Sequence, residues 1–164
     1  MPEGIEAARW IVAGLFAIIL IIASISDIRY RRIPNWCVLA LLALFIPWIF
    51  VGPEVSVLLS LAAFAIFIAA GIVLYAFGIW GAGDSKLISA VVLFIGWGRL
   101  AEFAFATALF GGILALIILV SNTTRVLAML NMHGQAPAKL TVPYGVAISI
   151  GAVLAVFGGL VARH

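Results

Sequence analysis

The sequence predicts an all-α fold: a polytopic membrane helix bundle with six transmembrane helices and both chain termini outside. Composition is the first reason. Hydrophobic residues make up 66% of the 164 residues and charged residues only 9%, and the mean hydropathy is +1.33. A soluble domain of this length cannot bury so much apolar surface, so the surplus must face lipid. The length leaves no room for a separate soluble domain, and residues 1–164 are expected to form a single integral membrane domain.

The second reason is that charged residues, prolines and glycines divide the chain into six apolar segments. A full span needs about 20 residues at a rise of about 1.5 Å each. The third, fifth and sixth segments reach this length, and the first two are slightly short. The fourth is shorter still and is expected to start below the bilayer surface or to borrow residues from the loop before it. The segments are residues 10–26, 36–51, 55–79, 86–97, 101–121 and 142–161.

The third reason is the distribution of lysine and arginine. If six spans alternate in direction, six basic residues fall on one side of the membrane and three on the other. The richer side is predicted to be cytoplasmic. It holds Arg29, Arg31, Arg32, Lys86, Arg125 and Lys139, and the opposite side holds Arg9, Arg99 and Arg163. The first apolar run is expected to be a span and not a cleaved signal, because Glu3 and Glu6 leave no basic region before it.

Composition also narrows the partners to the lipid bilayer and to molecules that reach it. The net charge is only +3 and the basic residues lie in short loops, a pattern that suits membrane orientation and not nucleic-acid binding. The single cysteine, Cys37, cannot form an internal disulfide and is interpreted as a small hydrophobe within a helix. His133 is the only internal histidine, so neither a metal ion nor another cofactor is expected.

Small residues recur at every fourth position in the last two spans and predict close helix packing within the bundle. Packing inside one bundle is favoured over a dedicated dimer face. The sequence does not decide whether the protein also forms a homo-oligomer. The residues are Ala104, Ala108 and Gly112 in the fifth span and Ala147, Gly151, Ala155 and Gly159 in the sixth.

Two of the six acidic residues stand apart from the others. Asp27 ends the first span and Asp84 begins the fourth, so the predicted topology places both on the cytoplasmic side at similar depth. An ionisable group at such a depth is costly and is therefore a functional candidate. The other four acids have solvent-side explanations in the tail, in an outer loop or at a helix start. They are Glu3, Glu6, Glu54 and Glu102.

Each aspartate taken alone has an ordinary explanation. Asp27 could pair with Arg31 one helical turn later, and Asp84 could cap the fourth helix, with Lys86 beside it as a topology signal. As a pair, with no other acid near, they favour a catalytic hypothesis. Two close carboxylates hold one proton between them, so the ionised member can take a proton from water while the other donates to a substrate carbonyl. This is aspartic peptidase chemistry.

Two glycines before the second aspartate fit the same chemistry. Gly81 and Gly83 lack a Cβ, so they can adopt positive φ and let another backbone come close. A peptidase needs such access, because its substrate is itself a strand of backbone.

Three stretches of the chain resemble the aspartic prepilin peptidase family, which includes the archaeal preflagellin peptidases. They are "DIRYRRIPN" at 27–35, "GAGDSKL" at 81–87 and "VPYGVAI" at 142–148. They are similar to the family's Asp, basic, Ile-Pro-Asn pattern, its G-x-G-D-x-K signature and its Pro-[Phe/Tyr]-Gly, in the same order within a six-span layout. The G-x-G-D motif also resembles that of presenilin-type proteases, but their first aspartate lies in a different motif and their chains are longer.

The resemblance implies which residues form the site. Asp27 and Asp84 become the catalytic pair, and Gly81 and Gly83 shape the loop of the second aspartate. The other residues of the three motifs are Pro34, Asn35, Lys86, Pro143, Tyr144 and Gly145.

The resemblance also implies the reaction. An intramembrane-type aspartic endopeptidase would remove the short basic leader from type IV pilin-like precursors at the cytoplasmic face of the inner membrane. The first cytoplasmic loop, residues 28–35, is too short to hold the cysteine-containing insert of many bacterial members, so N-methyltransferase activity is not expected. Short members of this kind serve tight-adherence (Flp) pili, and archaeal membership stays open on length alone.

Two other functions stay open as alternatives. A proton-coupled transporter also uses paired intramembrane carboxylates, but it predicts internal repeats and acids near the midplane, which the sequence does not show. A non-catalytic subunit of a pilus or secretion assembly would tolerate loss of either aspartate. The segment 122–141 is interpreted as a cytoplasmic loop with apolar anchors, the alternative being an interfacial helix that receives the substrate.

The topology can be tested with reporter fusions. Reporters fused at residue 30 or 130 should report a cytoplasmic position, and reporters at residue 53 or at the C-terminus an external one, because basic residues are retained inside. An alkaline phosphatase and green fluorescent protein pair measures both positions. The reverse pattern would contradict the predicted orientation.

Overall fold

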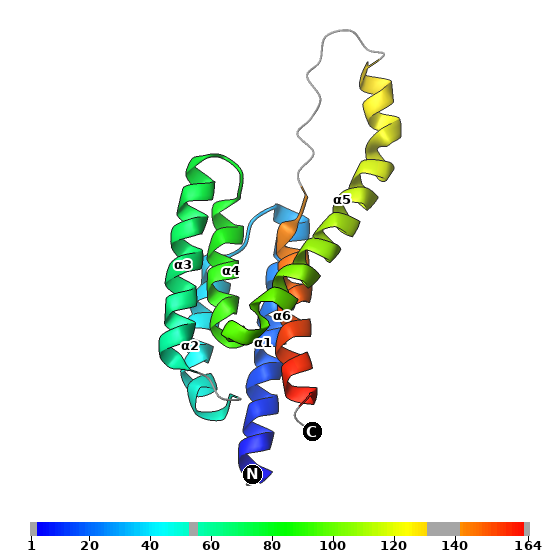
Figure 1. Ribbon diagram of the computed structural model, residues 1–164. Coiled ribbons are helices and arrows are strands. Elements are labelled where there is room, and N and C mark those ends of the chain that lie inside the picture. Colours follow the sequence, from blue (N-terminus) through cyan, green and yellow to red (C-terminus); the bar gives the residue numbers. More distant parts are fainter. Residues whose placement is uncertain (1–2, 53–55, 131–141, 163–164) are drawn as a thin grey trace.

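The structure is a computed structural model that describes residues 3–52, 56–130 and 142–162. Within these residues every regular element is a helix, which confirms the predicted helical bundle. The helices run alternately up and down, and the two chain termini lie at the same end (Figure 1). The helices are α1 (Glu3–Tyr30), α2 (Asn35–Val51), α3 (Val57–Ala76), α4 (Ala82–Ile95), α5 (Leu100–Leu130) and α6 (Tyr144–Val161), with the 3₁₀ turn η1 (Trp97–Arg99) before α5.

The helices correspond one to one with the six predicted apolar segments. Among the described segments four are long and apolar enough to cross a membrane: α1, α3, the first part of α5 together with η1, and α6. Helix α2 has 17 residues and α4 has 14, so the fourth segment is the shortest, as predicted. The chain is thus a multi-pass membrane protein.

Helix α5 continues beyond its predicted end. It runs to Leu130, so the first residues of the predicted 122–141 loop are helical, and the loop interpretation is wrong for residues 122–130. The physical reason is that neither glycine nor proline occurs between Gly112 and Gly134, so nothing stops the helix. The rest of the predicted loop, residues 131–141, lies outside the described residues.

Helix α4 lies at the centre of the bundle. All its residues from Leu87 to Ile95 are buried, as expected of a helix that is apolar on every side. Near its end the Phe94 ring packs against those of Phe16, Phe45 and Trp48, with centroid separations of 4.6, 5.6 and 5.7 Å. Because other helices surround α4, its shortness does not expose backbone to lipid.

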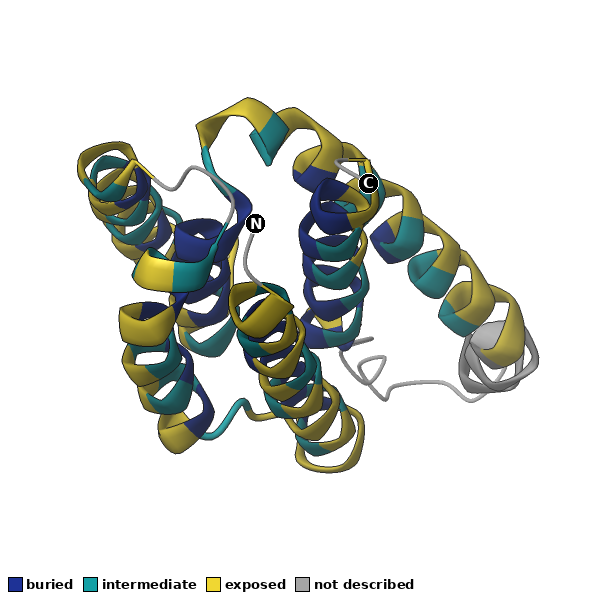
Figure 2. Ribbon diagram, turned by 90° about the horizontal axis from the view of Figure 1, so that it is seen from below, coloured by how far each residue is buried: buried dark blue, intermediate teal, exposed yellow. Residues whose placement is uncertain are grey.

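Helices α5 and α6 differ sharply in how far they are enclosed. Only 11% of the α5 span is buried, against 56% of α6. Seen from below, α6 is mostly dark blue whereas α5 runs outward beside it with most of its surface exposed (Figure 2). Helix α5 is therefore a peripheral helix that is held mainly through α6.

The small-residue stripe of α6 packs as predicted. Its four residues, Ala147, Gly151, Ala155 and Gly159, are all buried. A Cβ placed on Gly151 would overlap the Oγ1 of Thr107 in α5 and lie 3.0 Å from the Thr107 backbone nitrogen. The glycine therefore lets the two helix backbones approach closely.

The predicted stripe of α5 does not pack against a helix, and this interpretation is wrong. Ala104, Ala108 and Gly112 are exposed, and a Cβ on Gly112 would meet no atom within 4 Å. The neighbouring Gly111 faces α6 instead, where its Cβ would lie 3.6 Å from Ala147 and Tyr144. Because residues 111 and 112 are both glycines, the sequence does not indicate which of the two faces the partner helix.

The α5–α6 contact predicts an unusual effect of a small substitution. Gly151→Ala should lower the thermal unfolding temperature in detergent, because overpacking against the Thr107 backbone costs about 1–3 kcal/mol. Helix propensity alone would stabilise the variant by up to about 1 kcal/mol. Gly14→Ala in α1 is the control, since its Cβ would meet nothing within 4 Å. Equal or raised unfolding temperatures for both variants would contradict the close packing.

Candidate active site

The first aspartate is buried between the first and last helices. Asp27 lies one turn before the end of α1 and is 6% exposed. The backbone N–H of Gly145, in the first turn of α6, donates a hydrogen bond to Asp27 Oδ2 at 2.8 Å. The N–H groups of a first helical turn have no partner within the helix. The Asp27 carboxylate therefore acts as the cap of α6, at the positive end of that helix's dipole.

Gly145 has to be a glycine at this contact. A Cβ on it would lie 2.8 Å from Asp27 Oδ2 and 3.2 Å from the Asp27 Cγ. The third sequence motif thus meets the first across 118 positions of the chain. A second bond holds the same two helices together one turn deeper, where the buried Ser149 hydroxyl lies 3.3 Å from the Leu20 carbonyl oxygen and 2.7 Å from that of Gly145.

The second aspartate stands in the first turn of α4, ahead of its buried apolar run. Asp84 is half-buried. Burial, and to a smaller extent the negative charge of Asp27, raise the pKa of Asp84 to about 6. The charge of Asp27 can act in this way only if the two carboxylates are near each other. The fold thus brings together the two aspartates that the sequence singled out.

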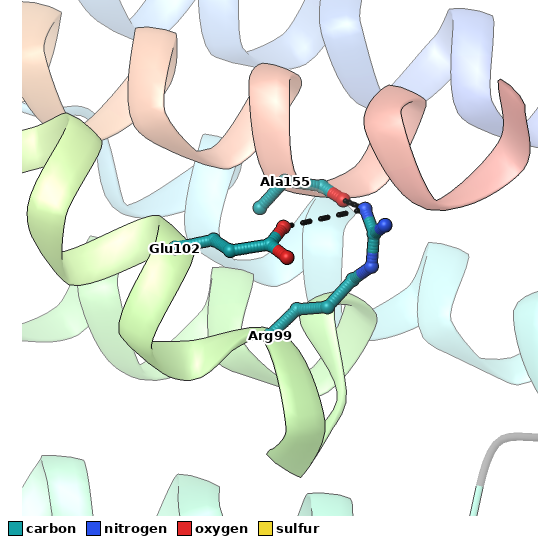
Figure 3. A network of polar contacts seen from close by, with 3 residues as sticks. All are labelled: Arg99, Glu102 and Ala155. Atoms are coloured by element: carbon teal, nitrogen blue, oxygen red, sulfur yellow. Dashed lines mark hydrogen bonds and ion pairs between the residues drawn. The ribbon is translucent and has the colours of Figure 1, made fainter. Parts of the chain in front are cut away.

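The ordinary explanations for the two aspartates fit this arrangement only in part. Arg31 forms no ion pair with Asp27 within the described residues, although its charge acts on that carboxylate. Arg99 and Glu102 form an ion pair at 3.5 Å (Figure 3). Asp84 is not the N-cap of α4 either. That position belongs to Gly81, and no side chain bonds there.

The two glycines do not adopt the positive φ that the sequence suggested. Gly81 has φ −75°, and Gly83 is helical; the described glycines with positive φ are Gly78 and Gly96. Gly83 does make a close contact, since its Cβ would lie 3.3 Å from the Ile33 Cβ and 3.6 Å from the Ile33 nitrogen, while the approach of a substrate backbone stays a prediction. Gly83 therefore brings the start of α4 against the connection that follows Asp27.

The remaining motif residues position these segments. Pro34 is the N-cap of α2, and Asn35 starts the helix. The Lys86 ammonium group donates to Asn35 Oδ1 at 3.3 Å, which ties the start of α4 to the start of α2. Arg31 adopts a positive φ of 53°, and its N–H bonds to the Asp27 carbonyl, so the chain turns sharply after the first aspartate.

Pro143 and Tyr144 lie at the entrance to α6. Pro143 is its buried N-cap, and Tyr144 is 49% exposed. The Tyr144 ring lines a cleft of about 500 Å³ that Asp84 and Gly81 also line. Tyr144 and the second aspartate thus face one space.

Sequence reasoning missed Ser85 and Ser149. The hydroxyl of Ser85 lies 3.3 Å from the Gly71 carbonyl oxygen and 3.1 Å from that of Gly81, which joins α3 to the start of α4. A Cβ on Gly71 would overlap Ser85 at 2.6 Å, so these helices touch closely. The available signal was position: Ser85 follows Asp84 directly, and Ser149 follows Gly145 by one turn.

Groups of three or more His, Cys, Asp or Glu side chains that could hold a metal ion are absent from the part of the chain that the structure describes. Cys37 is fully buried in α2, and His133 lies outside the described residues.

The fold and the site define a multi-pass membrane protein with two interacting carboxylates at one end of its helix bundle. Residues 14–116, more than half of the chain, match the type IV leader peptidase family. The chain belongs to this family. The match contains both Asp27 and Asp84, while the Pro143–Gly145 motif lies beyond it. No curated protein sequence matches the chain, and no solved structure matches it.

The Gly145 contact yields a test of the site. Gly145→Ala should reduce leader cleavage by about a hundredfold, because the added methyl group would displace the Asp27 carboxylate, and misplacement of a reacting group by about 1 Å has an effect of this size. Gly158→Ala, at the far end of the same helix, is the control. Rates are measured on a pilin-like precursor by gel shift. Equal cleavage rates for Gly145→Ala and Gly158→Ala would show that Gly145 does not position the Asp27 carboxylate for the reaction.

Proposed function

We propose that the protein is an aspartic endopeptidase that removes the short basic leader from type IV pilin-like precursors of the Flp type. Asp27 and Asp84 are the catalytic pair. The single observation that supports this most is geometric: Asp84 lines the same cleft as Tyr144, and the next residue, Gly145, donates to Asp27 Oδ2 at 2.8 Å, in a chain of the leader peptidase family. Of the motif glycines, Gly83 lets Ile33 lie close to the start of α4, and Gly81 leaves room for the Asp84 carboxylate, whose Oδ2 would lie 3.0 Å from a Cβ there.

The surroundings of the two carboxylates suggest a division of roles. Burial disfavours negative charge on Asp27, and the N–H of Gly145 and the positive end of α6 act against this cost. Asp84, with its raised pKa, then carries the proton that the pair shares. Asp27 takes a proton from a water as the water oxygen attacks the scissile carbonyl, and Asp84 gives its proton to the carbonyl oxygen. When the C–N bond of the tetrahedral intermediate breaks, the leaving amine takes a proton from Asp27, and one hydroxyl of the intermediate returns its proton to Asp84.

The proposed location is the cytoplasmic face of the inner membrane. Both aspartates lie at the bundle end that contains the α1–α2 connection and Lys86, where the basic residues gather. By the positive-inside rule this end is cytoplasmic. A leader that is removed before its precursor crosses the membrane would be accessible from this side. The short connection between Tyr30 and Asn35 has no room for a methyltransferase insert, so the proposed activity is cleavage alone.

The decisive experiment removes one carboxylate at a time. Asp27→Asn and Asp84→Asn should each reduce cleavage by about a hundred- to ten-thousandfold, because each variant lacks either the base or the acid. Purified protein in detergent is mixed with a Flp-type precursor, and leader removal is followed by gel shift. Glu102→Gln, an exposed acid at the opposite end, is the matched control and should keep the native rate.

Membrane insertion of each variant is checked by fractionation, so that loss of protein is not taken for loss of chemistry. Substantial cleavage by either aspartate variant would remove that residue from the pair. A non-catalytic assembly subunit would be favoured by two results together. The native protein would cut no precursor, and cells with either aspartate variant would behave like cells with the native protein. Proton flux that depends on both residues in the absence of cleavage would favour a transporter.

A further inference from the structure

The α1–α2 connection, residues 31–34, is bonded beside the first aspartate. Its backbone turns at Arg31, which has a φ of 53°. A residue other than glycine rarely adopts this conformation and keeps it only where its surroundings hold it. The Ser26 hydroxyl supplies such a hold, because it donates to the Arg32 carbonyl oxygen at 2.8 Å. Since Ser26 directly precedes Asp27, the start of the connection is fastened to the helix of the first aspartate.

The end of the connection is fastened beside the second aspartate. Lys86, two residues after Asp84, donates to Asn35 Oδ1 at 3.3 Å, directly after the connection. Before this bond, Ile33 lies against Gly83, where a Cβ would be 3.3 Å from the Ile33 Cβ. Two contacts with the same short segment thus flank Asp84 in the sequence.

Neither of the two donor residues, Ser26 and Lys86, faces the space in which a substrate would react. Ser26 is half-buried and Lys86 is exposed. Neither is among the described residues that line the cleft beside Asp84. The hydrogen bonds that they donate go to the chain itself. An effect of either residue on the reaction would therefore act through the position of an aspartate.

We propose that Ser26 and Lys86 are positioning residues. They fasten the helices of the two aspartates, α1 and α4, to the α1–α2 connection and so fix the separation of the two carboxylates. Two carboxylates share a proton only while they stay close together, so a connection that is released at either end weakens the pair. This rests on the proposed leader peptidase function and adds to it the residues that hold the catalytic pair in place.

The first test measures cleavage kinetics. Ser26→Ala and Lys86→Met should each lower kcat for a Flp-type precursor by about tenfold with KM unchanged, because a shift of less than about 1 Å misplaces an aspartate while the cleft keeps its shape. Ser24→Ala and Arg29→Met are the matched controls and should keep the native kcat. Ser24 lines a groove between α1 and α6, and Arg29 is an exposed basic residue in the last turn of α1. Gel filtration confirms that all four variants stay folded.

Variants that keep or remove the Lys86 bond separate positioning from other roles. Lys86→Arg keeps a donor and should retain most of the native kcat, whereas Asn35→Ala removes the acceptor and should match Lys86→Met. The double variant should lose no more than either single variant, since both changes remove the same bond.

Three kinetic results would overturn the proposal. A raised KM at unchanged kcat in Lys86→Met would show that this residue contacts the substrate. An equal loss in Arg29→Met would show that only the positive charge of this face matters. Native kcat in Ser26→Ala and Lys86→Met would show that neither bond holds the pair.

The second test needs no precursor. Ile33→Cys and Gly83→Cys, introduced together, should form a disulfide in lipid vesicles under a mild oxidant. The reason is that a Cβ at residue 83 would lie 3.3 Å from that of residue 33, and disulfides join Cβ atoms about 3.5–4.5 Å apart. The native Cys37 is kept because it is fully buried. The rate of disulfide formation then reports how firmly the connection is held against the start of α4.

The four changes of the first test are added to this double-cysteine protein one at a time. Ser26→Ala and Lys86→Met should slow disulfide formation severalfold, and the two control changes should not. No disulfide in the double-cysteine protein itself, or equal rates with all four changes, would overturn the proposal.

The two proposals fail in different ways. If the native protein cuts no precursor but Ser26→Ala and Lys86→Met slow the disulfide, the two residues hold the aspartate pair together and the peptidase proposal falls. If the native protein cuts the precursor and both variants cut it at the native rate, the peptidase stands and the positioning proposal falls.

Discussion

The hydrogen bond from the Gly145 N–H to the Asp27 carboxylate is the contact on which the rest of the site depends. It joins the last helix to the end of the first and gives the first turn of α6 its only side-chain cap among the described bonds. It also fixes the orientation of a buried acid that would otherwise have no defined direction. With α1 and α6 held in this way, α4 can place Asp84 beside them. Tyr144 then stands at the edge of the same cleft.

A second constraint comes from lipid, which accepts apolar side chains but not unpaired backbone groups. It explains why the chain uses helices throughout its described residues and why its irregular turns lie at the bundle ends. It also explains the use of serine inside the bundle. The buried hydroxyls of Ser85 and Ser149 lie within hydrogen-bond distance of carbonyl oxygens of their own helix and of a neighbouring one. Polar contacts between helices are thus made by side chains that are small enough to permit close packing.

The sequence predicts much of this fold, because hydropathy and helix formation are coupled in a membrane. The six segments follow from hydropathy, and the placement of Asp27 and Asp84 at one end of the bundle follows from span order and alternation. Details of side-chain direction do not follow. Adjacent glycines at 111 and 112 hide which face of α5 meets α6, and Gly83 is required by the neighbouring Ile33 and not by its own φ. Such facts depend on how helices are rotated, which neither composition nor spacing determines.

The shortness of α4 makes the site sensitive to the thickness of the surrounding bilayer. Fourteen helical residues extend about 21 Å, whereas a hydrocarbon core measures about 30 Å. Asp84 is half-buried at the start of this helix, so water must descend from the membrane surface to reach it. A thicker or more ordered membrane would deepen that descent, while local thinning around the bundle would shorten it. The lipid composition next to the protein thus becomes one of the determinants of how readily a hydrolytic water reaches the two acids.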